Sequence, residues 1–242
     1  QMNKAALEIY KRLAYANPQA YEPDLATSYN NLAILYGNTQ RFTESVQMNK
    51  AALEIRKRLA NANPQAHGPG LADSYNNLAA LYWATHRFTE SERMFKTALE
   101  IRKRLADANP QAYEPDLAKS YHNLGFLYSN IKRFSESKQM IKAALEILKR
   151  LADVNPHAYE PDLANTYNSL ANLYSDTQRF AESEQMYKAA LEIFKRLADA
   201  NPQAYEPDLA RSYNNLANLY SDTQRFVESE QMHKAALGIF MR

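Results

Sequence analysis

The sequence predicts an all-α fold, a solenoid built from stacked antiparallel helix pairs. Whole phrases such as KAALEI, PDLA and NNLA return every 46 residues, so the chain is a tandem repeat. Each period contains two segments of helical periodicity separated by short breakers. One helix pair alone cannot bury both of its apolar stripes, so neighbouring pairs must stack. We therefore expect eleven helices in a superhelical arc with one concave and one convex surface.

The 46-residue period divides the chain into one partial unit and five repeats. The period is marked by Met2, Met48, Met94, Met140, Met186 and Met232. The expected boundaries are 1–22 for the partial unit and 23–68, 69–114, 115–160, 161–206 and 207–242 for the repeats. Because Gln1 falls inside a repeat, we expect the chain to be a piece of a longer protein.

The first helix of each repeat, called helix A, is expected to begin at a proline. In the first full repeat, Pro23 suits the first turn of a helix, and Asp24 follows near the positive end of the helix dipole. The apolar positions then recur three and four residues apart, as on one face of a helix. They are Tyr29, Leu32, Ala33 and Tyr36.

The second helix, called helix B, begins near Phe42 and spans about 20 residues. It ends where Asn63-Pro64 removes a backbone donor. The small residues Ala33 and Ser45 are expected where helices A and B approach most closely. A linker is expected up to the next helix A at Pro69.

The second of these linkers is expected to be a hinge. It reads His67-Gly68-Pro69-Gly70, where the others read Tyr-Glu-Pro-Asp. Two glycines replace acidic residues there, which adds backbone freedom and removes the charge near the helix start.

Comparison of the internal copies separates constant positions from changing ones. The changing positions cluster on the outer face of helix A, as expected for a surface adapted to something other than its own core, although drift at exposed sites explains them too. One such position holds Thr27, Asp73, Lys119, Asn165 and Arg211, and another holds Ile34, Ala80, Phe126, Asn172 and Asn218. A third holds Gly37, Trp83, Ser129, Ser175 and Ser221.

A row of amides runs beside the changing positions. It comprises Asn30, Asn31, Asn76, Asn77, His122, Asn123, Asn168, Asn214 and Asn215. An asparagine has two donors and an acceptor, so such a row can hydrogen-bond the backbone of an extended peptide. The alternative is that these amides tie adjacent helices together. Trp83 and Phe126 are candidate aromatic anchors for a partner, or fill local gaps.

Composition argues against several classes of function. Lys and Arg number 29 and Asp and Glu 27, so no large basic field is available for nucleic acid or anionic lipid. No apolar run approaches the roughly 20 residues of a membrane helix, and no signal peptide is apparent, so we expect a soluble chain of undetermined compartment. Cysteine is absent and the five histidines fall in different repeat positions, so we expect no metal and no cofactor.

Catalysis is also not expected. The sequence has no Gly-rich phosphate loop and no nucleophile elbow. The recurring glutamate at Glu54 is interpreted as an i to i+4 partner of Arg58 on a solvated helix face.

The phrases SYNNLAILY and RFTESVQMNKAALEI resemble the tetratricopeptide repeat, and most closely the long-period repeats of kinesin light chains. The resemblance covers the whole chain, with Tyr29, Leu32, Ala33, Tyr36, Phe42, Ser45, Ala52 and Pro64 at the signature positions. It implies a non-catalytic scaffold whose helix A face lines a groove for a partner protein, and asparagines that hold the main chain of the ligand. The turn between helices departs from the family, which often has glycine there, at Gln40, His86, Lys132, Gln178 and Gln224.

The rival hypothesis is a structural protein that self-associates end to end into oligomers or filaments. In the last copy of helix B, Gly238 and Met241 replace a recurring glutamate and lysine. Phe240 lies beside them, so an apolar tip forms where a monomer would need a polar cap. A contact between unlike ends would propagate as an open filament.

Overall fold

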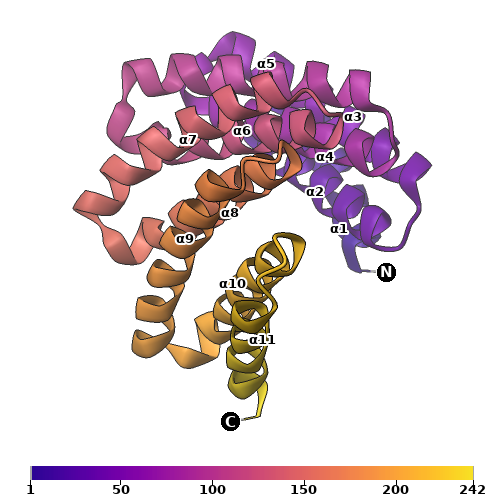
Figure 1. Cartoon of the computed structure of the whole chain (residues 1–242). Coiled ribbons are helices and arrows are strands. Elements are labelled where there is room, and N and C mark those ends of the chain that lie inside the picture. Colours follow the sequence, from indigo (N-terminus) through magenta and orange to yellow (C-terminus); the bar gives the residue numbers. More distant parts are fainter. Residues whose placement is uncertain (1, 242) are drawn as a thin grey trace. The chain divides into compact units, whose positions relative to one another are not determined.

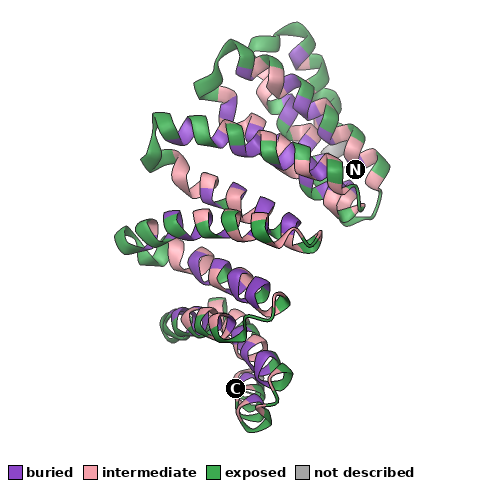
Figure 2. Cartoon of the chain, turned by 45° about the horizontal axis from the view of Figure 1, so that its top comes forward, coloured by how far each residue is buried: buried purple, intermediate pink, exposed green. Residues whose placement is uncertain are grey.

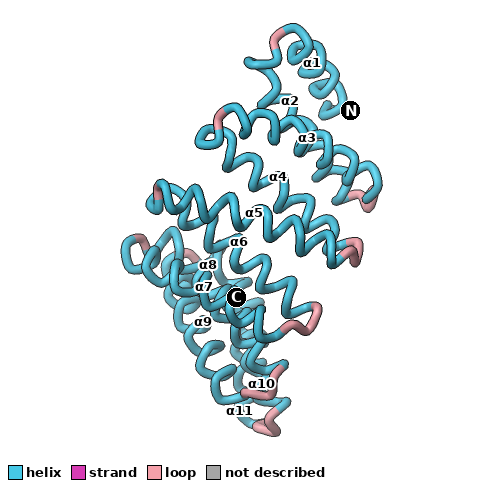
Figure 3. Tube along the Cα trace, turned by 90° about the horizontal axis from the view of Figure 1, so that it is seen from above, coloured by secondary structure: helices cyan, strands magenta, loops and turns pink. Residues whose placement is uncertain are grey.

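The computed structural model describes residues 2–241, and the side chains of residues 5–239 and 241. Within this range the chain forms eleven α-helices and no strand, which confirms the all-α solenoid of helix pairs (Figures 1 and 3). The helices are α1 (Met2–Ala16), α2 (Pro18–Asn38), α3 (Phe42–Ala62), α4 (Pro64–Ala84), α5 (Phe88–Ala108), α6 (Pro110–Asn130), α7 (Phe134–Val154), α8 (Pro156–Asp176), α9 (Phe180–Ala200), α10 (Pro202–Asp222) and α11 (Phe226–Phe240). The even-numbered helices are the A helices and the odd-numbered ones the B helices.

The chain consists of two compact units, and α6 crosses the division between them. Unit 1 is Gln1–Ser120 and unit 2 is Tyr121–Arg242. In unit 1, α1 to α5 pack in chain order, each against the next. In unit 2, α7 to α11 do the same. Each unit is therefore a short stack of alternating B and A helices.

A single asparagine joins each B helix to the next A helix. Asn63 ends α3 and also caps α4, where its Oδ1 accepts a hydrogen bond from the Ala66 N–H at 3.1 Å. Pro64 takes the first helical position, where no backbone donor is needed. The prediction that helix A begins at the later proline is therefore wrong, because Pro69 lies inside α4. The A helices start five residues earlier than predicted, at Pro18 and its equivalents.

The predicted linker, which was expected to act as a hinge, is helical. His67, Gly68, Pro69 and Gly70 all lie within α4, and Gly68 is buried. The asparagine cap one turn earlier keeps these residues helical despite their composition. Gly68 is reconsidered below for a different reason.

The turn from helix A to helix B requires a left-handed backbone at one residue. Gln40 has φ 57°, and the Arg41 N–H bonds to the Tyr36 carbonyl at 2.8 Å to close the end of α2. The Arg41 guanidinium then lies 4.2 Å from the centre of the Tyr36 ring and pairs with Glu44 at 2.7 Å. The left-handed conformation recurs at His86, Lys132, Gln178 and Gln224. These five residues adopt a left-handed backbone conformation that usually favours glycine.

A buried serine attaches each B helix to the A helix before it. Ser45 Oγ donates to the Ala33 carbonyl at 2.7 Å, and both residues are buried. Small side chains are needed there because the short serine side chain bonds directly to the backbone of the neighbouring helix. The same bond joins Ser91 to Ala79, Ser137 to Gly125, Ser183 to Ala171 and Ser229 to Ala217.

Apolar residues from consecutive helices form the core of each unit, and Figure 2 shows buried residues along the faces where helices meet. In unit 1, Leu7, Leu32 and Ile55 belong to one cluster. In unit 2, Leu191 and Leu216 belong to another. The stripes predicted from spacings of three and four residues therefore supply the core.

The predicted ion pair on the outer face of helix B is wrong. Glu54 pairs with Lys57 at 2.8 Å, three residues away. Arg58 instead pairs with Glu22 of the preceding A helix at 2.6 Å. An arginine side chain is long enough to reach the neighbouring helix, so tertiary packing selects this partner.

Candidate functional site

The changing positions of the A helices lie at the surface. Thr27, Asp73, Lys119, Asn165 and Arg211 are exposed, as are Ile34, Ala80, Phe126, Asn172 and Asn218. Ile34 and Phe126 are large apolar residues left in contact with solvent on this face. These two variable positions are thus accessible to a partner.

The amide row divides into side chains that tie the helices together and side chains that remain accessible. Asn30 is buried, and with its amide turned to satisfy the network its Oδ1 accepts from Arg56 Nη1 at 2.9 Å. His122 Nε2 lies 2.8 Å from Ser169 Oγ, and Asn214 Oδ1 lies 3.0 Å from His233 Nδ1. The tie between helices therefore accounts for part of the row.

The remaining members of the predicted binding set differ in exposure. Asn31, Asn172 and Asn218 are exposed. Asn76, Asn77, Trp83, Asn123 and Asn215 are half-buried, and Asn168 is buried. Only the exposed and half-buried members of this set are placed to meet a partner without a change in packing.

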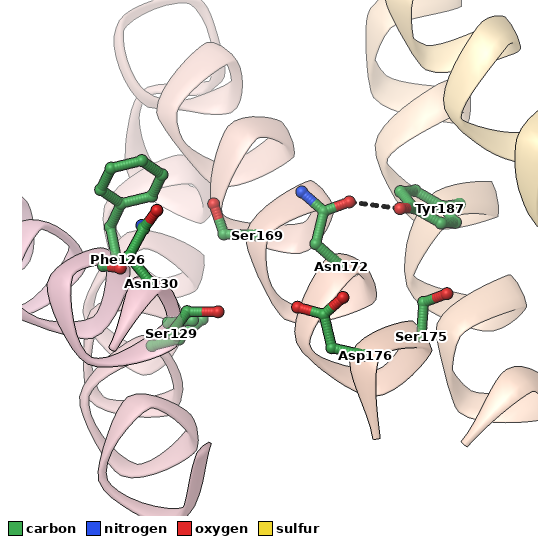
Figure 4. A pocket seen from close by; sticks show the side chains of 9 residues that line it. Phe126, Ser129, Asn130, Ser169, Asn172, Ser175, Asp176 and Tyr187 are labelled. Atoms are coloured by element: carbon green, nitrogen blue, oxygen red, sulfur yellow. Dashed lines mark hydrogen bonds between the residues drawn. The ribbon is translucent and has the colours of Figure 1, made fainter. Parts of the chain in front are cut away.

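A pocket of about 370 Å³ opens in unit 2 and is lined by residues of α6, α7, α8 and α9 (Figure 4). It includes Phe126 and Asn172, which the sequence had singled out. It is lined by Phe126, Ser129, Asn130, Ile141, Ser169, Asn172, Ser175, Asp176 and Tyr187. The lining combines one aromatic ring, several neutral polar groups and one carboxylate.

Tyr187 orients the amide of Asn172. Its hydroxyl donates to Asn172 Oδ1, so the amide nitrogen points away from α9, as Figure 4 shows. Burial raises the pKa of Tyr187 to about 12, and the nearby Asp176 and Asp222 carboxylates add to the rise. The hydroxyl therefore stays protonated near neutral pH and remains a donor. The Asn172 nitrogen is left to donate to a ligand.

Asp176 places a negative charge at the pocket. It is exposed and forms no ion pair with the described residues. Asn130 is held nearby, because its Nδ2 donates to the Phe126 carbonyl at 2.7 Å. The site is thus able to attract a cation next to an aromatic ring and an amide donor.

Sequence reasoning missed Asp176 and Tyr187. Each belongs to a position that changes between copies: Asn38, Ala84, Asn130, Asp176 and Asp222 in one case, and Asn49, Phe95, Ile141, Tyr187 and His233 in the other. That variation was a usable signal. The contact with Asn172, however, joins residues 15 apart on two helices.

Two further features, a metal-binding cluster and a membrane-spanning helix, are absent from the described residues. No group of three or more His, Asp or Glu side chains there is arranged to hold a metal ion. No helix in the described part of the chain has the length and apolar character needed to cross a membrane.

The family model described as tetratricopeptide repeat matches residues 24–104, 70–150 and 162–242, which together make up most of the chain. No curated protein matches the chain in sequence.

Among solved structures, BtubC (BKLC) from P. vanneervenii is similar with a TM-score of 0.81 and 24% identity, over 99% of this chain and 89% of that one. A kinesin-light-chain-like protein of P. anserina with nearly identical TPR-like repeats has a TM-score of 0.68 and 16% identity, over 88% and 93%. PilF of Pseudomonas aeruginosa has a TM-score of 0.60 and 15% identity, over 90% and 77%. At these identities the likeness shows the fold alone, a helical solenoid.

Proposed function

Because the chain belongs to the tetratricopeptide repeat family, we propose that it is a non-catalytic scaffold that binds a segment of a partner protein on the exposed face of its A helices. A fold alone does not define a function, so the proposal rests on the site. The observation that carries it is the pocket of about 370 Å³ on this face of unit 2, lined by positions that differ from their counterparts in other repeats.

The lining chemistry favours an extended peptide with a basic side chain. The Asn172 amide nitrogen, oriented by Tyr187, suits a peptide carbonyl. Asp176 suits a lysine or arginine, and the exposed ring of Phe126 gives such a side chain an apolar or cation–π contact. Aromatic residues of this kind often contribute most to binding at an interface.

The experiment selects random peptides on the immobilised protein and measures their affinity for variants by calorimetry. We expect the double variant Phe126→Ala, Asn172→Ala to weaken the selected peptides at least about tenfold, equivalent to about 1.4 kcal/mol. Asp176→Asn should weaken those with a basic residue specifically. Glu146→Ala, at an exposed residue of α7 outside the pocket, serves as the matched control.

The melting temperature separates binding from folding in this experiment. Phe126 and Asn172 are exposed, so the double variant should stay folded, with a lower melting temperature because the Tyr187 hydroxyl loses its acceptor. Selected peptides that bind the double variant and Asp176→Asn as tightly as the parent would contradict the proposal. Selection that yields no peptide above background would contradict it as well.

Self-association is a second proposal, favoured by an exposed apolar surface on α11. Leu237 is 58% exposed, whereas its equivalents Leu145 and Leu191 are 7% and 6% exposed. Met241 is also exposed, and no heavy atom lies within 4 Å of where a Cβ of Gly238 would be. The side chain of Phe240 lies outside the described residues.

Light scattering over a concentration series tests self-association. The parent is compared with a Leu237→Asp, Met241→Asp variant. Assembly lost in the variant would support a contact at α11. A parent that stays monomeric at high concentration would remove this second proposal and leave the first one standing.

A further inference from the structure

Gly68 lies at a position where every other full repeat has a glutamate. The other residues at this position are Glu22, Glu114, Glu160 and Glu206. The backbone does not demand glycine, because Gly68 lies inside α4 with an ordinary negative φ. The missing side chain is therefore a local difference in chemistry that the backbone conformation does not require.

In two other repeats this glutamate binds an arginine of the following B helix. Glu22 pairs with Arg58 at 2.6 Å, and Glu160 pairs with Arg196. In both pairs the glutamate is mostly buried between helices and the arginine is more exposed. The glutamate thus links its A helix to the B helix that carries the arginine.

Arg104 is the equivalent arginine in the second repeat, and its glutamate is absent. It forms neither a hydrogen bond nor an ion pair with the residues that the structure describes. Where the side chain of a glutamate would lie, unit 1 has a pocket of about 310 Å³. Its lining is mainly apolar and comes from α3, α4 and α5, with Gly68, Leu71, Ile101, Arg104 and Leu105 among its residues.

We infer that this pocket binds the carboxylate side chain of a glutamate presented by another protein. The guanidinium of Arg104 offers a planar pair of donors that matches a carboxylate. Leu71, Ile101 and Leu105 would pack against the aliphatic part of the glutamate and an adjacent apolar residue. The incoming side chain would replace the missing internal one and reproduce the pairing of Glu22 with Arg58.

This pocket is separate from the face proposed above to bind a peptide. Gly68 and the exposed Asp73 are five residues apart, which corresponds to about 140° around a helix. The other pocket lies in unit 2, whereas every residue lining this one belongs to unit 1. Either site can therefore fail its test without deciding the other.

The probe is the blocked tripeptide acetyl-Leu-Glu-Leu-amide, with acetyl-Leu-Gln-Leu-amide as its uncharged counterpart. Titration is followed by NMR at the Arg104 Nε–H and the Leu105 methyl groups of the full chain. We expect saturable shifts at both groups with the glutamate probe, and binding at least about tenfold weaker with the glutamine probe.

Two variants and one control complete the test. Gly68→Glu should abolish binding by supplying the internal carboxylate, and Arg104→Gln should abolish it by removing the exposed cation. Arg58→Gln serves as the matched control. Arg58 already pairs with Glu22, so its replacement should leave binding of the probe unchanged. An added Cβ at Gly68 would lie 3.3 Å from Leu105 Cδ2, so helicity of Gly68→Glu is checked first, and Arg104→Gln stands independently.

Three results would overturn the inference. One is no shift at Arg104 with the glutamate probe, and another is equal affinity for the glutamate and glutamine probes. The third is a folded Arg104→Gln variant that binds the glutamate probe as tightly as the parent.

Discussion

The two units differ at one buried or half-buried position that lies between successive repeats. In unit 1 this position holds Tyr10, Arg56 and Arg102, whereas in unit 2 it holds Leu148 and Phe194. Arg56 Nη1 donates to the Gly70 carbonyl at 2.8 Å and to Ser74 Oγ at 3.0 Å. Arg102 makes the equivalent bonds to the Asp116 carbonyl and Ser120, and its Nη2 also pairs with Asp73 at 2.6 Å. Unit 1 thus joins its full repeats through the guanidinium groups of a half-buried arginine, Arg56, and a buried one, Arg102.

In unit 2 the same position leaves polar atoms without partners. Asn168 and Ser212 are the equivalents of Asn30 and Ser74, and Phe194 stands where the arginine would be. Asn168 Oδ1 and Ser212 Oγ are buried and have no hydrogen-bond partner among the described residues. The same backbone arrangement therefore accepts a polar or an apolar contact at this position. In unit 2 the arginine is replaced by Phe194, but the neighbouring Asn168 and Ser212 are still polar.

The largest expected effect concerns Arg102, which is only 7% exposed. Arg102→Ala should destabilise the protein by about 2–4 kcal/mol, because it leaves a cavity and the buried Ser120 loses its donor, whereas the exposed Asp73 can be hydrated. Arg102→Leu, which copies Leu148, should cost less than about 1.5 kcal/mol, because apolar residues of similar volume can replace a buried ion pair. Unfolding in guanidinium chloride measures both. Equal losses for the two variants would mean that the polar contact is not what distinguishes unit 1.

The reverse exchange brings the unit 1 contact into unit 2. Phe194→Arg alone should cost about 1–3 kcal/mol, because a charge is buried where Asn165 stands in place of the Asp73 carboxylate. Adding Asn165→Asp should recover part of this loss, with a coupling of about 0.5–3 kcal/mol in a double-mutant cycle. Additive effects would show that the aspartate does not reach the arginine in unit 2.

Acid should weaken unit 2 through His122, whose position holds Asn30 and Asn76 in unit 1. Burial lowers the pKa of His122, and the opposing attraction of Asp162 is smaller. The unfolded chain therefore binds a proton more readily, so stability present above about pH 6.5 falls as the pH drops through the lowered pKa.

Urea midpoints measured from pH 8 down to pH 5 check this expectation. His122→Asn provides the matched control, since it copies the unit 1 residue and cannot titrate. The parent should lose more stability than the variant over this range. The same loss in both proteins would place the acid sensitivity elsewhere.

The smallest expected effect contrasts a glycine in each unit. Gly70→Ala should stabilise unit 1 by about 0.5–1 kcal/mol, because an added Cβ has ordinary contacts at 3.6 Å or more and glycine is unfavourable inside a helix. Gly125→Ala should destabilise unit 2, because its Cβ would lie 2.7 Å from Ile141 Cγ1. Thermal unfolding measures both signs. A gain at Gly125 would show that Ile141 moves aside at little cost.

Much of the fold could be predicted because the chain contains its own internal comparison. Six copies of one pattern identified the helix pairs, the core stripes and the surface positions that change. The start of helix A was predicted wrongly because each repeat has two prolines, such as Pro64 and Pro69, that suit the first turn of a helix. Only capping geometry shows that Asn63 begins α4 and that Pro69 lies within it.

The candidate site was predictable in part. Phe126 and Asn172 were identified because they lie on the outer face of helix A at a position that varies between copies. Asp176 and Tyr187 were missed because their proximity depends on how α8 and α9 pack. The hydrogen bond of Tyr187 to Asn172 joins two helices. The periodicity within each helix does not show which of their residues lie opposite each other.

The sequence by itself determined an all-helical tandem repeat and the faces that each helix buries, because periodicity and apolar spacing are local properties that six copies repeat. The tertiary structure alone decided which polar groups meet. Arg58 binds Glu22 across 36 residues, whereas Arg104 lacks such a glutamate because Gly68 stands at its position. Long side chains can reach several partners, and only the packing of neighbouring helices selects among them.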